Sequence, residues 1–321
     1  MDKSEKTGPS SGDQPGPVAE PPLREPQFVL LAPPPWDDYE LLDTGDGKKF
    51  ERFGRYRLIR PEAQALWPPT LPSHVWDAAD AVFQPGRGDD GPGQWIQRQP
   101  LPESWLLQYD RLAFWARLTP FRHTGVFPEH GAHWSWVGRQ VALAARPVRV
   151  LVLFGYTGVV TLMAARMGAQ VCHVDASRPA VRWARANQEA SGLLDCPIRW
   201  IVDDVVAFVH REQRRGARYD LIVMDPPVFG RGPKGQIWRL HESLPTLVAS
   251  CAALLSECPL GLLVHAYATT FSSVTLSNLV QSAMSPHPGE VTAGELVLVD
   301  TAAGRPLSAA LFARWSGALE G

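Results

Sequence analysis

Three short motifs in this chain carry groups that could hold a nucleoside and act on a planar molecule beside it. Gly155 and Gly158 bracket a turn after an apolar run, Asp175 ends the following run, and the sequence Asp-Pro-Pro-Val-Phe begins at Asp225. Glycines let a backbone approach a ligand closely, and carboxylates accept hydrogen bonds from ribose hydroxyls. The motifs lie about 20 and 50 residues apart. We therefore expect them at the ends of successive strands that share one ligand site.

The first motif predicts contacts to the nucleoside from a strand-to-helix turn. Its glycines lack a Cβ, and the helix that follows offers free backbone N–H groups at its N-terminus. Such a turn also occurs without a ligand, and for the glycines alone the two interpretations stay equally open. The complete G-x-G-x-x-G pattern of dinucleotide sites is missing, which favours S-adenosylmethionine over NAD. The predicted cofactor contacts in this turn are Phe154, Gly155, Tyr156, Thr157 and Gly158.

Acidic residues after the next two strands predict the rest of the cofactor site. Asp175, with Ser177 beside it, could accept both ribose hydroxyls, although a single Asp after a strand is often a helix N-cap instead. Asp203 and Asp204 follow the third strand, where a carboxylate could accept the adenine amino group. Of these two residues we favour Asp204.

The Asp225 motif predicts the catalytic site. Pro226 and Pro227 cannot continue a sheet ladder, and they hold the chain in an extended turn. The Asp225 carboxylate, the proline carbonyls and the Phe229 ring would then form a rigid rim beside the methyl donor and against a flat base. A simple strand terminator would explain the prolines but not Asp225 and Phe229 together. Residues 230–239 add three basic side chains, which could meet phosphates or belong to a solvated loop.

The elements that must position these motifs alternate between strands and helices from residue 148 onward. Apolar runs predict five strands, with helices between them. This order predicts a doubly wound α/β sheet with its ligand at the C-terminal strand ends. The strands are expected at 148–154, 170–174, 198–202, 219–224 and 261–266, the helices at 158–167, 179–190, 205–214, 244–255 and 275–284, and a closing antiparallel pair at 295–299 and 309–315.

The first part of the chain is predicted to be organised differently. Residues 1–26 are rich in Ser, Gly and Pro with little to bury, so we expect a disordered tail. Residues 27–119 are expected to form a small β-rich domain, and residues 120–321 the cofactor-binding domain. Eight of the twelve tryptophans precede Val137, which indicates either an aromatic core or a base-stacking surface. The expected N-terminal elements are strands at 39–42, 49–53 and 56–59 and a helix, capped by Ser73, that reaches residue 83.

Composition sets limits on partners and location. The formal net charge is -2, so binding of RNA would have to rest on a local basic patch. The four cysteines form no C-x-x-C pair, and we expect no metal. No apolar run reaches the ~20 residues that span a bilayer, and the chain starts without a secretory signal. We therefore expect a cytoplasmic protein that does not enter membranes, with its oligomeric state left open.

The motifs resemble those of a known enzyme group. The segments 151–158, 173–177 and 225–229 are similar to the large-subunit ribosomal-RNA methyltransferases of the cytosine carbon-5 and guanine N7 group. The likeness extends over about 120–283. The segment His123-Thr-Gly-Val-Phe127 resembles the K-T-G-F-F segment that packs beside the cofactor in that group, although the Gln-Arg that follows it there is absent here. The resemblance implies a Rossmann-like class I methyltransferase fold, S-adenosylmethionine as cofactor, and an RNA substrate, with ribosomal RNA favoured.

The cysteines bear on which atom would be methylated. Methylation of cytosine carbon-5 needs a thiolate that adds to carbon-6. The segments directly after the fourth and the fifth predicted strand contain no cysteine. We therefore predict direct transfer to a base nitrogen, with Asp225 as acceptor and with His265 and Tyr267 able to orient the substrate. Two alternatives stay open: the same fold acting on a small molecule or a protein, and a non-catalytic nucleotide-binding module or NAD oxidoreductase.

Overall fold

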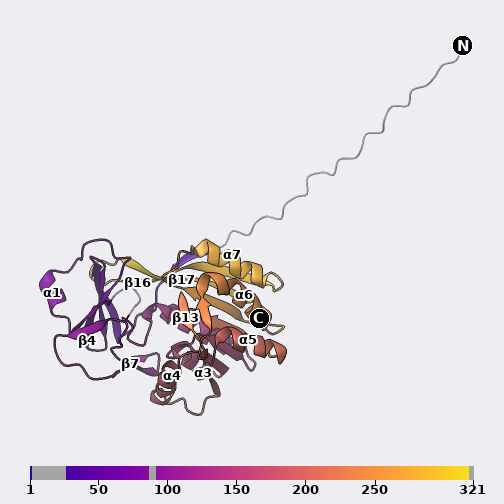
Figure 1. Ribbon diagram of the computed structural model, residues 1–321, viewed down its shortest axis with the longest axis horizontal. Helices are drawn as coiled ribbons and strands as arrows, with labels where there is room; N and C mark the ends of the chain where they lie inside the picture. The colour runs from indigo at the N-terminus through magenta and orange to yellow at the C-terminus, as the bar shows by residue number, and fades with distance from the viewer. Residues whose placement is uncertain (2–26, 87–91, 318–321) are drawn as a thin grey trace.

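The computed structural model describes Met1 and residues 27–86 and 92–317. Apart from Met1, the predicted tail at 1–26 lies outside the described residues. The chain forms a β-rich part near its N-terminus, drawn in indigo and purple in Figure 1, and a larger α/β part beside it. The large sheet of the α/β part positions the predicted motifs.

This large sheet has eight strands in the order β1-β16-β17-β15-β12-β9-β10-β11. Five of its strands, β9, β10, β11, β12 and β15, run parallel to one another. Strand β17 runs antiparallel to both β15 and β16. The five predicted parallel strands and the closing antiparallel pair are confirmed. Their bounds are β9 Arg149–Leu153, β10 Gln170–Asp175, β11 Ile198–Val202, β12 Leu221–Met224, β15 Gly261–Ala266, β16 Gly289–Val299 and β17 Pro306–Gly317.

Both faces of the large sheet are covered. Alternate residues of β9 belong to two different hydrophobic clusters, with Leu151 and Leu153 in one and Val150 and Val152 in the other. Strands that are buried on two faces have nearly continuous apolar sequences, and this explains the apolar runs of β9, β12 and β15. The carboxyl ends of these strands therefore form the open edge where a ligand can bind.

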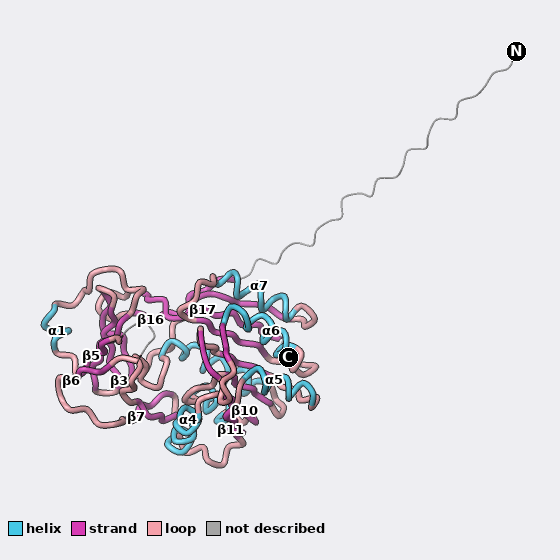
Figure 2. The backbone as a smooth tube through the Cα atoms, in the orientation of Figure 1, coloured by secondary structure: helices cyan, strands magenta, loops and turns pink. Residues whose placement is uncertain are grey.

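Helices lie around the large sheet, and Figure 2 shows α1 apart from them, beside the N-terminal strands. The five predicted helices are present. Ser177, Asp204 and Ser272 cap three of them by accepting a hydrogen bond from a backbone N–H three residues on. Helix α2 was not predicted. The helices are α1 Ser73–Asp77, α2 Gly131–Leu143, α3 Val159–Arg166, α4 Arg178–Ala190, α5 Val205–Arg214, α6 Leu240–Ala252 and α7 Ser273–Met284, with a 3-10 helix η1 at Pro128–His130.

The N-terminal sheet has five strands in the order β2-β3-β4-β5-β6. The predicted meander of β2, β3 and β4 is confirmed, but the helix predicted from Ser73 to residue 83 is wrong. Helix α1 ends at Asp77 because the chain turns into pairing with β4: the Asp80 N–H donates to the Arg57 carbonyl at 2.7 Å, and the Asp80 carboxylate accepts from the Arg57 N–H at 2.6 Å. The strands are β2 Tyr39–Gly45, β3 Lys48–Phe53, β4 Tyr56–Pro61, β5 Ala81–Gln84 and β6 Gln94–Gln97.

Several contacts join the two parts. Strand β1 (Gln27–Leu31) pairs parallel to β16, so the first residues of the predicted N-terminal domain form an edge strand of the large sheet. The Thr44 hydroxyl donates to the Asp300 carboxylate at 2.8 Å, across the two sheets. A hairpin of β7 (Trp105–Tyr109) and β8 (Leu112–Ala116) packs on α4, where the Trp115 N–H donates to the Asn187 side chain at 2.8 Å. A second hairpin, β13 (Phe229–Arg231) and β14 (Ile237–Arg239), follows β12.

The N-terminal tryptophans are largely core residues. Trp36 packs on Tyr109 and Trp134, with ring centroids 5.4 and 6.0 Å apart, and Trp105 and Trp136 are buried as well. These four residues fit the aromatic-core interpretation and not the base-stacking one. In the part of the chain that the structure describes, no helix has the length and apolar character needed to cross a membrane.

Candidate active site

The loop between β9 and α3 is tight. Phe154 and Tyr156 have φ angles of +55° and +48°, left-handed values that residues with side chains rarely adopt. Gly158 has a φ of +83°. A Cβ on Gly155 would lie 2.3 Å from the His173 ring. The loop thus depends on its glycines, and it suits close approach of a ligand to the backbone.

Asp175, at the end of β10, ties this loop to the next strand. Its carboxylate accepts hydrogen bonds from the backbone N–H groups of Tyr156 at 2.9 Å and Ser177 at 2.7 Å. Burial raises the pKa of Asp175, against the two N–H groups, which lower it. Each carboxylate oxygen has a second lone pair, so the group can also accept ribose hydroxyls. The Ser177 side chain is used as the N-cap of α4.

Asp203 and Asp204 have different structural roles. Asp203 pairs with Arg211 on α5. Asp204 caps the same helix, with Oδ1 accepting from the Ala207 N–H at 2.9 Å. Of the two, only Asp204 lines the cleft that also contains Asp175. The cap uses Oδ1, and the contact of Asp204 with the adenine amino group stays a prediction.

The predicted residues line two neighbouring spaces. A cleft of about 980 Å³, including its open mouth, runs along the strand ends. Thr157 lies behind the loop instead, where it is buried and donates its hydroxyl to the Gly125 carbonyl at 2.6 Å. The cleft is lined by Phe154, Tyr156, Asp175, Ser177, Asp204, Asp225 and Pro227, whereas Gly155, Thr157 and Gly158 line a smaller cavity.

The segment His123–Phe127 packs beside the cleft. His123 and Phe127 line it, and the Phe127 and Tyr156 ring centroids are 5.7 Å apart. A Cβ on Gly125 would lie 2.1 Å from the Trp183 ring of α4, so only glycine fits at this position. Burial, and then the charges of Arg60, Arg122 and Lys49, lower the pKa of His123 to about 3. His123 is therefore neutral near pH 7, and it forms an aromatic wall together with Phe127.

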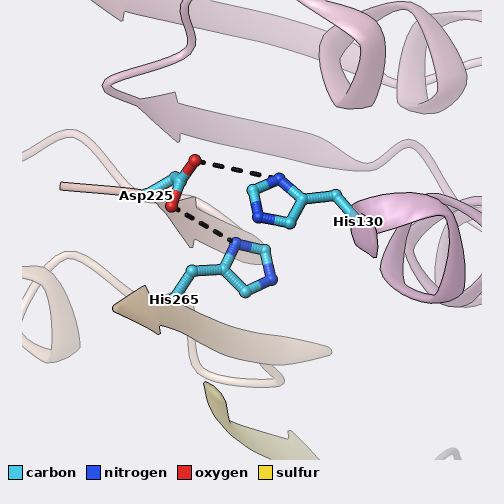
Figure 3. Close-up of side chains that lie close together, drawn as sticks. All are labelled: His130, Asp225 and His265. Atoms are coloured by element: carbon cyan, nitrogen blue, oxygen red, sulfur yellow. Dashed lines mark ion pairs between the residues drawn. The ribbon is translucent and has the colours of Figure 1, made fainter. Parts of the chain in front are cut away.

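Asp225, at the end of β12, faces the edges of two imidazole rings, those of His130 and His265 (Figure 3). Its Oδ2 is 3.8 Å from His130 Nδ1, and its Oδ1 is 3.9 Å from His265 Nδ1. The rings are stacked, with centroids 4.2 Å apart and planes 14° apart. Burial raises the pKa of Asp225, and His130 lowers it. Because both distances exceed hydrogen-bonding range, both carboxylate oxygens can accept a proton or a hydrogen bond from a substrate.

His265 is held from behind by a residue that the sequence did not single out. His133 Nδ1 lies 2.8 Å from His265 Nε2, and both rings are buried. Burial is the largest cause that lowers the pKa of each. Both rings are therefore neutral near pH 7, and one donates its hydrogen to the other. His130 and His133 were missed because their partners lie far away in sequence, 132 positions in the case of His133 and His265.

His130, Asp225 and His265 are residue types that also bind metals, and their ligand atoms lie within 4.8 Å of one another. A metal would require nitrogen lone pairs that converge on one point at about 2.1 Å. Two stacked, nearly parallel rings direct their Nδ1 atoms the same way instead. The arrangement suits a hydrogen-bonded or proton-accepting carboxylate better, and the expected absence of a metal stays a prediction.

The two prolines after Asp225 connect the cleft to the hairpin that follows. Pro226 is buried. Pro227 lines the cleft, and its carbonyl accepts a hydrogen bond from Trp238 Nε1 at 2.6 Å. The Trp238 ring packs on Phe154, with centroids 4.9 Å apart. The Pro-Pro segment thus fixes the hairpin of β13 and β14 against the loop between β9 and α3.

Phe229 lies where the sequence did not place it. In the hairpin Gly230 is opposite Trp238, and the Trp238 side chain is buried. The aromatic ring that points into the protein here is therefore that of Trp238 and not that of Phe229. The Phe229 ring is 53% exposed and is not among the residues lining the cleft. Arg231 lines the cleft instead, with its guanidinium 5.9 Å from the Phe229 ring centroid. Phe229 and Arg231 share one face of the strand, but only Arg231 reaches the cleft, and the Phe229 ring lies at the surface, away from the position predicted beside the methyl donor.

A doubly wound sheet with a tight glycine loop after its first strand, an acid ending its second and Asp-Pro-Pro after its fourth defines a class I methyltransferase. Residues 68–262 match the sequence model of the S-adenosylmethionine-dependent methyltransferases. The chain belongs to this family. It is an enzyme, and S-adenosylmethionine is its cofactor, as predicted.

Similar proteins agree with this assignment. "Ribosomal RNA large subunit methyltransferase K" of Neisseria meningitidis is 36% identical over 224 residues, which cover 66% of this chain and 61% of that protein. The chain thus spans less than two thirds of this relative's length. The crystal structure of the SAM-dependent methyltransferase from Agrobacterium tumefaciens is 44% identical with a TM-score of 0.86, covering 92% of this chain and 97% of that one. A methyltransferase-like structure complexed with S-adenosylhomocysteine is 17% identical, with a TM-score of 0.66 over 87% and 76% of the two chains, and shares the fold.

Proposed function

We propose that the protein methylates a base of RNA, with ribosomal RNA the favoured substrate, by direct transfer to a base nitrogen. The observation that carries this proposal is the position of Asp225. Its carboxylate lies in the wall of the cofactor cleft with both oxygens available. The basic hairpin at the same cleft contributes Arg231 to the lining and bears Lys234 and Arg239 nearby, where cations can meet phosphates. The name of the Neisseria relative supports the same substrate.

The cleft fits the cofactor. Its volume of about 980 Å³ with the open mouth leaves room for a nucleoside and an amino acid. Asp175 would accept the ribose hydroxyls, and Oδ2 of Asp204 the adenine amino group. The loop at Gly155 would lie beside the amino-acid end, because a glycine leaves the backbone open to a ligand. We therefore keep the predicted cofactor residues, with Thr157 and Ser177 acting through the backbone that they fix.

The residues of the chain prepare the acceptor. S-adenosylmethionine supplies a methyl group bound to a positively charged sulfur. Transfer of that methyl group from sulfur to an amino nitrogen would leave the nitrogen with one proton too many, and this proton has to go to a base. Asp225 accepts that proton through the oxygen that faces His130. His265, hydrogen-bonded to His133, lies 3.9 Å from the other oxygen and forms that side of the site.

A cysteine intermediate has no support in this site. All four cysteines lie in the described part of the chain, and none of them lines the cleft. Burial raises the pKa of Cys172 to about 11, and it raises that of the fully buried Cys251 as well. Thiols of this kind stay protonated and unreactive near pH 7. Direct transfer without a covalent intermediate is therefore proposed.

Two measurements test the function. Calorimetric titration should give binding of S-adenosylmethionine and S-adenosylhomocysteine but not of NADH. Radiolabelled methyl transfer should then mark total RNA from cells that lack the gene for this protein. Label that enters only small molecules or proteins would reject the RNA substrate and favour the alternative acceptors.

With an RNA substrate we also propose a cytoplasmic location, and we keep residues 27–119 and 120–321 as the proposed domains.

A further inference from the structure

A second pocket lies between the N-terminal sheet and the large sheet. Its empty space, counted together with the open solvent at its mouth, is about 580 Å³. On one side its lining consists of Lys49 of β3, Arg60 and Pro61 of β4, and Glu62, which follows β4. Ala309 and Ala310 of β17 form the opposite side. None of these residues belongs to the cofactor cleft.

The second pocket and the cofactor cleft share one wall. His123, Phe127, Asp225 and Tyr267 line both of them. Three of these side chains are aromatic, and the fourth is the carboxylate proposed to receive the proton. A molecule in the second pocket would therefore have Asp225 beside it and the methyl donor just beyond. This is the placement that transfer between two bound molecules requires.

The residues that line the second pocket suit one heterocycle. Aromatic rings on the shared wall offer surfaces for stacking. Lys49 and Glu62 pair at 3.3 Å with side chains only 12% and 17% exposed, so a donor and an acceptor sit together at the N-terminal side. Arg60 pairs with Glu51 at 2.7 Å and donates to the Arg122 carbonyl at 3.1 Å, which makes it a support for the wall.

We infer that the methyl-accepting nucleobase, turned out of its RNA strand, binds in this second pocket and is read there by the N-terminal sheet. This inference rests on the proposed RNA substrate. A helical RNA cannot enter a pocket of 580 Å³, so the base has to leave its stack, as it does in other enzymes that modify bases. Lys49 and Glu62 present the hydrogen-bonding groups that recognise its edge, and Asp225 meets the nitrogen that receives the methyl group.

The test compares variants of the full chain on total RNA from cells that lack its gene. Ala309→Trp fills the pocket from β17, and it should lower kcat/KM on the order of 100-fold. Lys49→Gln and Glu62→Gln each remove one charge without a large change in shape. Each should raise the half-saturating RNA concentration about tenfold, with kcat nearly unchanged. Lys48→Gln is the matched control, because Lys48 is the exposed neighbour on the same strand.

Binding of S-adenosylhomocysteine to every variant is measured alongside and should stay at the wild-type value. Two outcomes would overturn the inference, and they are distinct. If the wild-type chain labels no RNA, the proposed function fails, and this inference fails with it. If it labels RNA but Lys49→Gln and Glu62→Gln behave like Lys48→Gln, the second pocket is not the base site. These two variants decide the matter even if Ala309→Trp does not fold.

Discussion

The proposed cofactor side and the proposed acceptor side of the active site are built in different ways. On the cofactor side the groups that contact one another are close in sequence: Asp175 accepts from the N–H of Tyr156, 19 positions away, and Asp204 from that of Ala207, three positions away. On the acceptor side His133 and His265 are 132 positions apart. The second pocket draws its lining from Lys49 at one end of the chain and Ala310 at the other.

The difference also concerns the type of contact. The cofactor side relies on backbone N–H groups and on a turn that tolerates no Cβ at Gly155. The acceptor side relies on the orientation of side chains, above all the stacked His130 and His265 beside Asp225. A backbone site is damaged by added atoms, whereas a side-chain site is damaged by a lost functional group. The two sides should therefore fail separately.

The largest separate failure is expected for Asp225→Asn. An amide of the same shape cannot take the proton, so kcat should fall by on the order of 10²- to 10⁴-fold. The dissociation constant of S-adenosylhomocysteine should change less than about threefold, because Asp225 contributes no proposed contact to the nucleoside. Single-turnover methyl transfer and calorimetry measure the two quantities. Asp195→Asn, an exposed loop position, is the control. Weaker cofactor binding with unchanged turnover would overturn the assignment of Asp225 to the acceptor side.

Gly155→Ala should produce the opposite pattern on the cofactor side. The new Cβ would lie 2.3 Å from the His173 ring, so the loop has to shift. Affinity for S-adenosylhomocysteine should fall about tenfold or more, and the free energy of unfolding should decrease by about 1–3 kcal/mol. The double variant Gly155→Ala, His173→Ala should recover part of the affinity, with His173→Ala alone as its control. Equal affinity in wild type and Gly155→Ala would mean that the cofactor does not approach this loop.

This contrast also explains what could be predicted from the sequence. The strand ends, the glycine loop and the acids at 175, 204 and 225 follow from local patterns, because the same short segments that form the turns also place the groups. No local signal marks His130, His133, Lys49 and Glu62, since only tertiary packing brings them to the acceptor side. The helix expected from Ser73 failed for the same reason. Its last residues, from Ala81, prefer to pair with β4, a partner that lies earlier in the chain.

The smallest effect is expected for Phe229→Ala, and it separates the sequence-based placement from the observed one. A ring beside the methyl donor would be needed for turnover, so its loss would lower kcat and weaken cofactor binding. The ring is instead 53% exposed, beside Arg231 on the hairpin, where it can stack only on an RNA base outside the pocket. We expect a rise of about fivefold in the half-saturating RNA concentration, with kcat and cofactor affinity unchanged. Ile237→Ala, equally exposed on the same hairpin, removes apolar surface without a ring and should have no effect. A loss of kcat confined to Phe229→Ala would show that the hairpin closes over the methyl donor when RNA binds, which would move Phe229 to the catalytic residues first predicted.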